Sequence, residues 1–246
     1  MSLESQIADL VSATNTLITT FNTKKTSIDA AVAAAIAAIP VGLKNYYINP
    51  LTGDDTAVGS AAAPLKTLDK ALSTTPVGGV CVAYLQTDYV MNNSLNVDGR
   101  FLHIRSDVSG VKRKITHNYY ATSDGSATYL AGFVQYNGAQ IMVSDLTFVL
   151  PSPAGLNPVP SGFVNALFKT NSSAGTVMCA VKMTGCEVIA PADYLGFIVG
   201  SPNCAIAFEV LNVQFPAGFG GRYITNVAAG TSSATLSNLL TNLSTL

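Results

Sequence analysis

The chain has 246 residues and a formal net charge of −1, with 11% charged residues against 48% hydrophobic ones. A chain of this length holds one large domain, or one medium domain with an appendage. The near-zero charge argues against electrostatic capture of nucleic acid or of an anionic membrane. A surface poor in charge and rich in Ser, Thr, Asn and Ala is typical of an elongated, assembled protein rather than of a freely diffusing enzyme.

The first residues, MSLESQIADL, contain neither a basic segment nor a continuous apolar run, so we expect no secretory signal peptide. The apolar run at residues 30–39 is about half as long as the roughly 20 residues that cross a bilayer. We therefore expect a soluble protein that is made in a cytoplasm and does not insert into a membrane.

Residues 1–40 carry the pattern of a coiled-coil stem. Eight positions lie at alternating steps of four and three from Leu3 to Ile28, the a/d spacing of a heptad repeat, and six of them are apolar; the other two are Thr14 and Lys24. Pro40 ends the helix. A lone helix cannot bury such a seam, and Ile and Leu mixed at the a and d positions lead us to expect three strands rather than two, with other oligomers left open. The alternative is a helix that packs on its own domain. The expected oligomerisation seam is Leu3, Ile7, Leu10, Leu17, Phe21, Ile28, Val32, Ile36 and Ile39.

Residues 41–76 form a junction with a distinctive order of residues. An aromatic segment is followed by a Gly-Asp-Asp turn and then by a Pro-Leu-Lys-Thr segment. The residues are Tyr46-Tyr47-Ile48-Asn49-Pro50, Gly53-Asp54-Asp55, Gly59, Pro64-Leu65-Lys66-Thr67-Leu68 and Ala71-Leu72. Over about 27 residues, this order and spacing resemble the opening signature of the pectate-lyase-like β-helix proteins. The resemblance implies a right-handed parallel β-helix and says almost nothing about chemistry.

The junction residues also have physical roles of their own. We expect Gly53 to adopt a positive φ in a turn, and Asp54 and Asp55 to bond neighbouring backbone amides. A carboxylate pair for catalysis or Ca²⁺ binding is the alternative for the two aspartates. Residues 67–72 predict a short helix that caps the open end of the strand stack.

Residues 77–230 repeat the pattern apolar-x-apolar-x-x-apolar-x-apolar, which predicts two short strands joined by a two-residue bend. The pattern occurs at residues 141–148, 181–188 and 208–215. Asp145, Gly185 and Asn212 stand in the bends, where a sharp corner needs the left-handed backbone region. The sequence therefore predicts a short parallel β-helix of roughly five or six turns.

Three further features complete the expected organisation. The four cysteines lack C-x-x-C spacing, which disfavours a zinc site, and three of them, Cys179, Cys186 and Cys204, fall on inward strand positions. The Pro-rich residues 151–162 cannot pair in a ladder and should form an excursion. Leucines at helical spacing in residues 231–246 predict a terminal helix or cap, with a disordered end as the alternative.

The acidic residues do not form a catalytic constellation. Beyond residue 125 they are Asp145, Glu187, Asp193 and Glu209, and aligning the repeats does not bring the two glutamates together. The alignment instead places Lys182 beside Glu209 as a surface ion pair. The catalytic residues of any enzyme therefore stay unknown, and a site shared between subunits remains open. We expect no cofactor and no bound metal.

Five of the thirteen basic residues lie close together in the sequence: Arg100, Arg105, Lys112, Arg113 and Lys114. This basic cluster is a candidate ligand-binding patch for an anionic glycan or a partner protein. The alternative is that these are ordinary outward-facing residues of the early strands.

A coiled-coil stem that leads through this junction into a β-helix resembles the tail fibres and tailspikes of bacteriophages. The resemblance implies a homotrimer in the tail of a virion, made in the host cytoplasm and joined through its stem to other tail or baseplate proteins. We expect a structural or receptor-binding fibre that contacts a host-surface glycan or links tail components. The alternatives are a polysaccharide depolymerase with an intersubunit active site, and a bacterial surface adhesin, which would normally carry a signal peptide.

Overall fold

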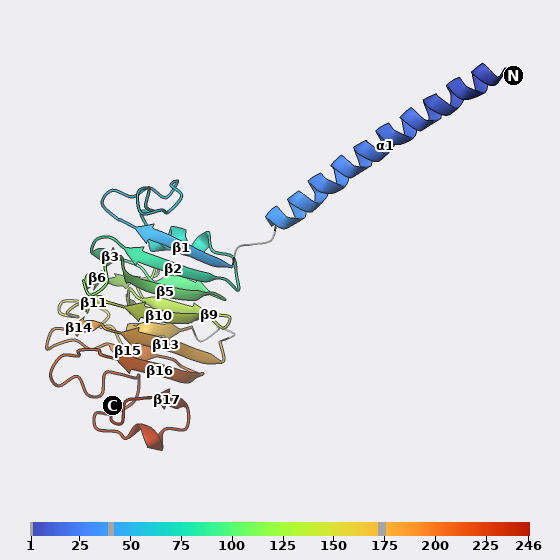
Figure 1. Cartoon of the computed structure of the whole chain (residues 1–246). Helices are drawn as coiled ribbons and strands as arrows, with labels where there is room; N and C mark the ends of the chain where they lie inside the picture. The colour runs from blue at the N-terminus through green and yellow to red at the C-terminus, as the bar shows by residue number, and fades with distance from the viewer. Residues whose placement is uncertain (1, 39–41, 172–175) are drawn as a thin grey trace. The chain divides into compact units, whose positions relative to one another are not determined.

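The computed structural model describes residues 2–38, 42–171 and 176–246. The chain divides into two compact units, Met1–Val41 and Gly42–Leu246. The first unit contains one long helix, α1 (Leu3–Ala38), and the second is a body built mostly of parallel β-sheets (Figure 1). None of the helices in the described ranges is long and apolar enough to span a membrane.

Helix α1 runs for 36 residues, and most of its hydroxyl side chains are satisfied within the helix. Seven Ser and Thr side chains donate to the carbonyl four residues earlier; Thr14, for example, donates to Leu10 O at 2.8 Å. Thr14 occupies an a position of the heptad, so its own helix satisfies its hydroxyl. A polar seam position of this kind does not require a hydrogen-bond partner from another chain.

The described residues of the body form three parallel sheets. Sheet A consists of β1 (Leu43–Ile48), β2 (Val80–Leu85), β5 (Phe101–Ser106), β10 (Gln140–Ser144), β13 (Met178–Thr184), β16 (Ala205–Leu211) and β17 (Leu239–Thr241). Sheet B consists of β3 (Tyr89–Met91), β6 (Arg113–His117), β11 (Leu146–Val149) and β14 (Glu187–Ile189). Sheet C consists of β4 (Leu95–Asp98), β9 (Phe133–Tyr136), β12 (Ala166–Thr170) and β15 (Phe197–Gly200).

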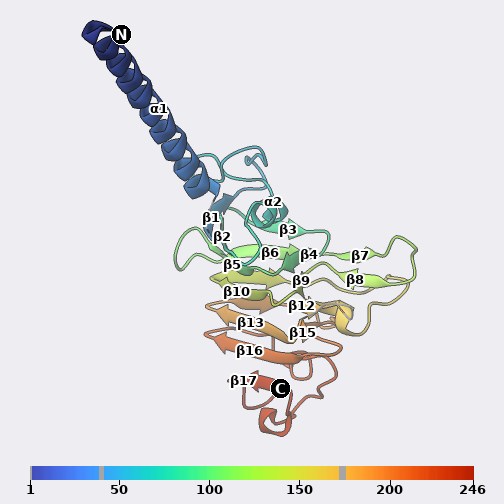
Figure 2. The same cartoon turned by 90° about the vertical axis from the view of Figure 1, so that its right-hand side faces the viewer.

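The chain visits the three sheets in a fixed cyclic order. From β2 to β16 it passes from sheet A to B to C and back to A, and each returning strand pairs in parallel with the strand one cycle earlier. The strands of sheet A therefore lie one below another from β1 to β17 in Figure 1. An antiparallel hairpin, β7 (Tyr119–Ala121) and β8 (Thr128–Leu130), interrupts the cycle between β6 and β9 and projects from the body in Figure 2.

Inward-facing side chains stack strand over strand into one core. In sheet A, the stacked and buried residues are Cys81, Leu102, Ile141, Val181 and Phe208. In sheets B and C they are Tyr89, Ile115, Phe148 and Val188, and Leu95, Phe133, Phe168 and Val199. Because every cycle contributes to the same three stacks, the core continues along the whole body.

The corners between sheets A and B follow the sequence-based prediction. Asp145, Gly185 and Asn212 have φ values of 54°, 63° and 54°, in the left-handed region. Each stands directly after a sheet A strand and turns the chain toward sheet B. The two residues without the conformational freedom of glycine are Asp and Asn, the types that enter this region most readily.

Two cysteines face differently from the expectation. Cys81 is fully buried in the core, whereas Cys204 is only partly buried and lies just before β16 begins. All six residues of β2 are apolar, so alternation alone could not choose its inward face. The structure turns the small Cys81 and Ala83 inward, while Cys179 and Cys186 are buried as expected.

The two junction aspartates stabilise the turn by accepting hydrogen bonds from backbone N–H groups. Asp54 accepts from the backbone N–H of Thr56 at 2.8 Å, and Asp55 accepts from the N–H groups of Lys66 and Thr67 at 2.9 Å each. Thr67 is the N-cap of α2 (Leu68–Ser73), the short helix expected here. Gly53, however, does not adopt the positive φ expected of it. It is needed for close packing, because a Cβ there would lie 2.3 Å from Leu65 O.

The predicted helix at the end of the chain does not form. Residues 231–246 contain a single 3₁₀ turn, η2 (Ser233–Thr235), and the short strand β17. Leu239 pairs with Ile206 of β16, which gives this segment the parallel ladder of sheet A. The helical spacing of the tail leucines was misleading, because only two of them, Leu239 and Leu246, are buried. The tail leucines at this spacing are Leu236, Leu239, Leu240, Leu243 and Leu246.

The Pro-rich residues 151–162 contain no strand and connect β11 to η1 (Phe163–Asn165), as expected of an excursion. The excursion is tied to the hairpin, since Thr128 Oγ1 donates to Pro158 O at 2.7 Å. The hairpin and the excursion therefore form a joint cover beside sheet C.

Candidate functional sites

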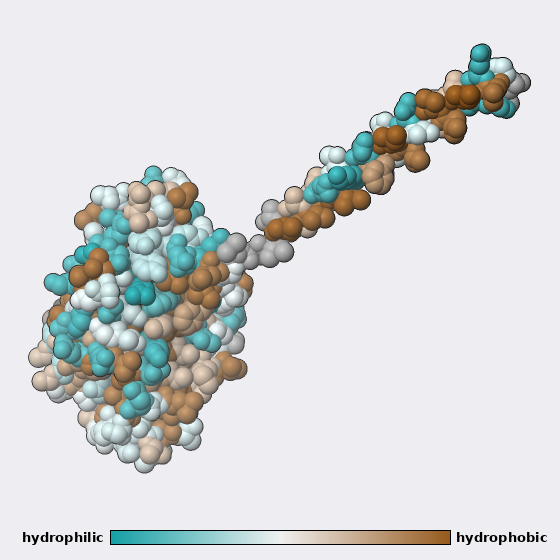
Figure 3. Space-filling view, viewed as in Figure 1, coloured by the Kyte–Doolittle hydropathy of each residue, from teal (hydrophilic) through white to brown (hydrophobic). Residues whose placement is uncertain are grey.

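The expected seam residues form an exposed apolar stripe along α1. Their exposed fractions run from 52% at Val32 to 72% at Leu3. In Figure 3 apolar side chains recur along the helix from one end to the other. Ile39, the last expected member, lies outside the described residues. An apolar stripe that remains exposed over so long a helix marks a surface that another chain can cover.

Two seam residues were not predicted from the sequence. Val11 and Ile18 are 53% and 52% exposed, and each follows a d-position leucine, so both occupy e positions of the heptad. They widen the stripe from two to three positions in seven, the width typical of helices in a bundle rather than of a two-stranded coiled coil. A count of a and d positions alone could not find them.

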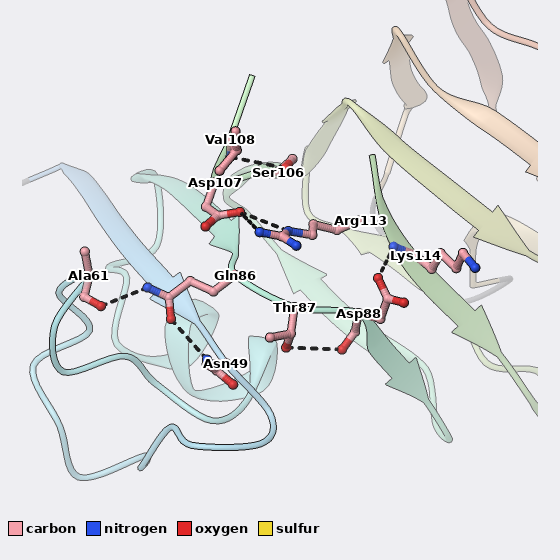
Figure 4. Close-up of polar contacts among 10 residues, drawn as sticks. All are labelled: Asn49, Ala61, Gln86, Thr87, Asp88, Ser106, Asp107, Val108, Arg113 and Lys114. Atoms are coloured by element: carbon pink, nitrogen blue, oxygen red, sulfur yellow. Dashed lines mark hydrogen bonds and ion pairs between the residues drawn. The ribbon is translucent and has the colours of Figure 1, made fainter. Parts of the chain in front are cut away.

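The basic cluster is not assembled into one cationic site. Arg113 donates to Asp107 Oδ1 from Nε at 3.0 Å and from Nη2 at 2.8 Å (Figure 4). Lys112 Nζ lies 4.0 Å from Glu187. Arg100 donates to the backbone carbonyls of Thr75 and Asp98, both at 2.7 Å. The side chains of these three basic residues therefore contact partners within the body itself.

The remaining two basic residues lie on different sheets. The guanidinium of Arg105 stands over the Tyr84 ring, 5.6 Å from its centroid, on the outer face of sheet A. Lys114 is exposed at the start of β6, where its backbone N–H donates to Asp88 (Figure 4). Arg100 and Arg105 are separated by five residues of extended chain, roughly 16 Å. The closeness of the five cations in sequence does not carry over into one patch.

Sheet A carries an open groove of about 580 Å³ on its outer face, lined mainly by apolar and small side chains. Phe101, Ala180, Ala207 and Leu240 stand among its outward residues. The predicted ion pair lies in it: Lys182 Nζ approaches Glu209 at 3.0 Å. Because both side chains are well exposed, the pair contributes ~0–1 kcal/mol. In the described ranges, no three His, Cys, Asp or Glu residues gather as metal ligands would.

A second pocket, of about 280 Å³, lies over the outer face of sheet C. Asn96, Val134 and Lys169 occupy successive register positions on β4, β9 and β12 and line it. The hairpin contributes Tyr120 and Tyr129, whose rings meet edge to face with centroids 5.9 Å apart. This pocket therefore combines a strand floor with an aromatic wall.

The pocket's aromatic side chains are held by hydrogen bonds. The Tyr120 hydroxyl donates to Ser94 Oγ at 3.0 Å. On β9, the Tyr136 hydroxyl accepts from Asn171 Nδ2 at 3.0 Å. Rings fixed in this way present a surface that is formed before any ligand arrives.

Lys169 is the most unusual residue of this pocket, because it faces outward from β12 and is still only 3% exposed. Its neighbour Phe168 points into the core, so the lysine side chain lies on the opposite face of the sheet. The cover closes over it: Nζ donates to the carbonyl oxygens of Leu130, at the end of β8, and of Val164, in η1. Burial lowers the pKa of Lys169 to about 7.

This pocket was not predicted from the sequence. A sequence-level signal exists, since Lys169 follows the apolar run Ala166–Phe168 in a strand, but the covering segments lie elsewhere in the chain. Whether an outward lysine is exposed or buried depends on the insertions before β9 and before β12. Strand periodicity carries no information on how those insertions fold back.

Comparison with known proteins gives few matches. The chain matches no family model and no curated protein. Among solved structures it is similar to a rhamnogalacturonan lyase, with a TM-score of 0.40 and 11% sequence identity. The match covers 77% of this chain and 60% of the lyase, so the chain spans less than two thirds of that protein. A likeness this distant carries no information about activity.

Proposed function

We propose that the chain is the subunit of a homotrimeric fibre, in which α1 forms a three-stranded coiled-coil stem and the β-rich body contacts a receptor or another fibre component. The observation that carries the proposal is the apolar stripe of α1, exposed over the length of a 36-residue helix. Identical helices have identical stripes, so further copies of this chain are the partners whose seam matches in length and spacing.

The residue types at a and d do not themselves favour three helices, because Ile7 lies at an a position and Leu10 and Leu17 lie at d positions, the arrangement that two-stranded coiled coils prefer. The width of the apolar stripe is the feature that favours three helices over two. Val11 and Ile18 add e positions to the stripe, and a wider stripe is buried more completely when each helix touches two neighbours.

For the body, the proposed architecture is a right-handed parallel β-helix. The cyclic passage through three parallel sheets and the residue stacks in the core support it. The right-handed sense of the proposed β-helix rests on a general preference. Parallel strands of one sheet that are joined by a crossover are overwhelmingly connected in the right-handed sense. In this architecture every cycle presents the same outward faces, which suits an elongated binding surface.

The fibre belongs, in this proposal, to the tail of a bacteriophage virion, where α1 joins it to other tail proteins and the body meets the host surface. The support is the resemblance of the stem, the junction signature at residues 46–72 and the repeat pattern, taken together. The role assigned is structural or receptor-binding. The two glutamates of the body lie on different sheets and do not form a catalytic pair. Glu187 forms an ion pair with Lys112, and Glu209 forms one with Lys182.

The test uses the full chain and two matched pairs of substitutions in α1. Leu17→Glu with Phe21→Glu places charge in the seam, where burial of each side chain stabilises the trimer by roughly 1.5–3 kcal/mol per chain. Asn15→Glu with Asn22→Glu adds the same charge at b positions outside the seam. Sedimentation equilibrium should give three chain masses for the unmodified and control proteins and a single chain mass for the seam variant. Equal masses for the two variants would contradict the proposal.

A further inference from the structure

The ammonium group of Lys169 is buried without a counter-ion. In the described part of the chain three ion pairs occur, and none of them includes Lys169. An ammonium group has three donors, and Nζ uses two of them on the carbonyls of Leu130 and Val164. Carbonyl oxygens accept hydrogen bonds but do not cancel the charge. A buried cation of this kind is costly unless an anion joins it.

Neighbouring groups on the packed elements do not supply that anion. Asp98, the acidic residue on the outward face of β4, accepts from Asn137 Nδ2 at 2.6 Å and forms no ion pair within the described residues. His117 of β6 is fully buried beside the lysine, and its Nδ1 lies 2.7 Å from Ala131 O. Burial lowers the pKa of His117 to about 4, so the imidazole is neutral near pH 7. The hairpin and β9 contribute the phenols of Tyr120, Tyr129 and Tyr136, and η1 contributes backbone carbonyls and the amide of Asn165.

The 280 Å³ pocket stands where the missing anion could enter, since Lys169 is one of its lining residues. Its volume is at the lower end of small-molecule sites, which suits one compact ring rather than a chain of several. Tyr120, Tyr129 and Tyr136 offer aromatic surface for the body of a ligand. Asn93 and Asn96 add amide groups that bond hydroxyl or carbonyl oxygens.

We propose that this pocket binds a small monocarboxylate built on a single ring, with the carboxylate placed against Lys169 Nζ and the ring against the tyrosines. A single ammonium matches one negative charge. A phosphate group, with its greater charge, is typically met by Arg forks, several cations or a row of backbone N–H groups. The site is independent of the trimer proposal, because all of its lining residues belong to the body of one chain.

Two sources of such a ligand share this chemistry, an aromatic acid and an acidic sugar, and calorimetric titration of the full chain distinguishes them. The probes are benzoate with its neutral amide, benzamide, and glucuronate with neutral glucose. At about pH 6, where Lys169 is charged, we expect at least one acid to bind roughly tenfold or more tightly than its neutral partner. Preference for benzoate alone identifies an aromatic acid, and preference for glucuronate alone an acidic sugar.

Variation of pH and of the lysine supplies the controls. At about pH 9 Lys169 has lost its proton, whereas both acids stay ionised, so the preference for the acid should fall at least several-fold. Lys169→Met should abolish the preference, and Lys182→Met, which replaces an exposed lysine on sheet A, should leave it unchanged. If the Lys169→Met variant folds poorly, the pH comparison decides the matter on unmodified protein. Equal binding of acid and neutral partner at pH 6, or saturable binding of none of the four probes, overturns the proposal.

Discussion

At the scale of single residues, the buried ionisable side chains predict how the stability of the protein depends on pH. His117 stacks on Phe148, with ring centroids 5.9 Å apart, and meets Phe133 edge to face. With Ala131 O as acceptor, Nδ1 carries the hydrogen, and Nε2 has no protein partner. Protonation of Nε2 would therefore place an unpaired N–H and a charge among apolar rings. This arrangement explains why the pKa of His117 is lowered to about 4.

The lowered pKa predicts a loss of stability in acid. The unfolded chain takes up the His117 proton near pH 6.5, but the folded chain does so only near pH 4. The stability that the neutral imidazole contributes is therefore present above pH 6.5 and is lost as the pH falls toward 4. Between about pH 7 and pH 4.5, the free energy of unfolding should fall by about 2 kcal/mol more in the unmodified chain than in His117→Gln. Denaturant titrations at equal protein concentration measure this difference, and parallel pH profiles would contradict the assignment.

Lys169 illustrates what residue patterns cannot predict. The alternation of β12 places the lysine outward, and an outward lysine is normally solvated. Its burial results from the hairpin and the Pro-rich excursion, which are held together by the bond between Thr128 and Pro158. The five basic residues at 100–114 show the converse, since they cluster in sequence and separate in space. A candidate site made by insertions on a regular scaffold is therefore visible only after the scaffold is folded.

At the scale of elements, the repeat pattern predicted the strand–corner–strand units at residues 141–148 and 181–188 correctly. The repeat at 208–215 has its first strand and corner, but an isolated bridge at Gln214 stands in place of its second strand. Strands β10, β13 and β16 lie where the repeats at residues 141, 181 and 208 were found, and the corner residues have the expected backbone conformation. The prediction worked because a period of two with one interruption is specific to strands that bend at a fixed place. It was wrong for the tail, where leucine spacing matches a helix, but pairing with β16 stabilises a strand instead.

The corner at Asn212 offers a direct test of this interpretation. Asn212 is exposed and has a φ of 54°, a conformation that a β-branched residue adopts only under strain. Asn212→Val should lower the free energy of unfolding by about 1–2 kcal/mol, whereas Asn212→Gly should be nearly neutral. Thermal and denaturant unfolding of the two variants would measure the difference. Equal destabilisation by Val and Gly would show that the side chain, rather than the backbone conformation, is what matters at this corner.

At the scale of the whole molecule, the two units pose different physical problems. The body has its own continuous core, built from three stacks of inward residues. Helix α1 has no such core, because the apolar side chains of its seam are exposed from Leu3 to Ile36. A helix of this kind gains most of its stability from packing against partners. The need for those partners is the physical basis of the proposed assembly, and the heptad spacing that reveals it could be read from the sequence alone.

The proposed stem-driven trimer is tested most directly by the molar mass of the full chain in solution, measured by light scattering at several protein concentrations. We predict about three times the 25.5 kDa chain mass, and a single chain mass for a protein that begins at Leu43 and therefore lacks α1. A trimer that survives removal of α1 would move the association surface to the body. A full chain that remains at 25.5 kDa at every concentration would contradict the proposed trimer.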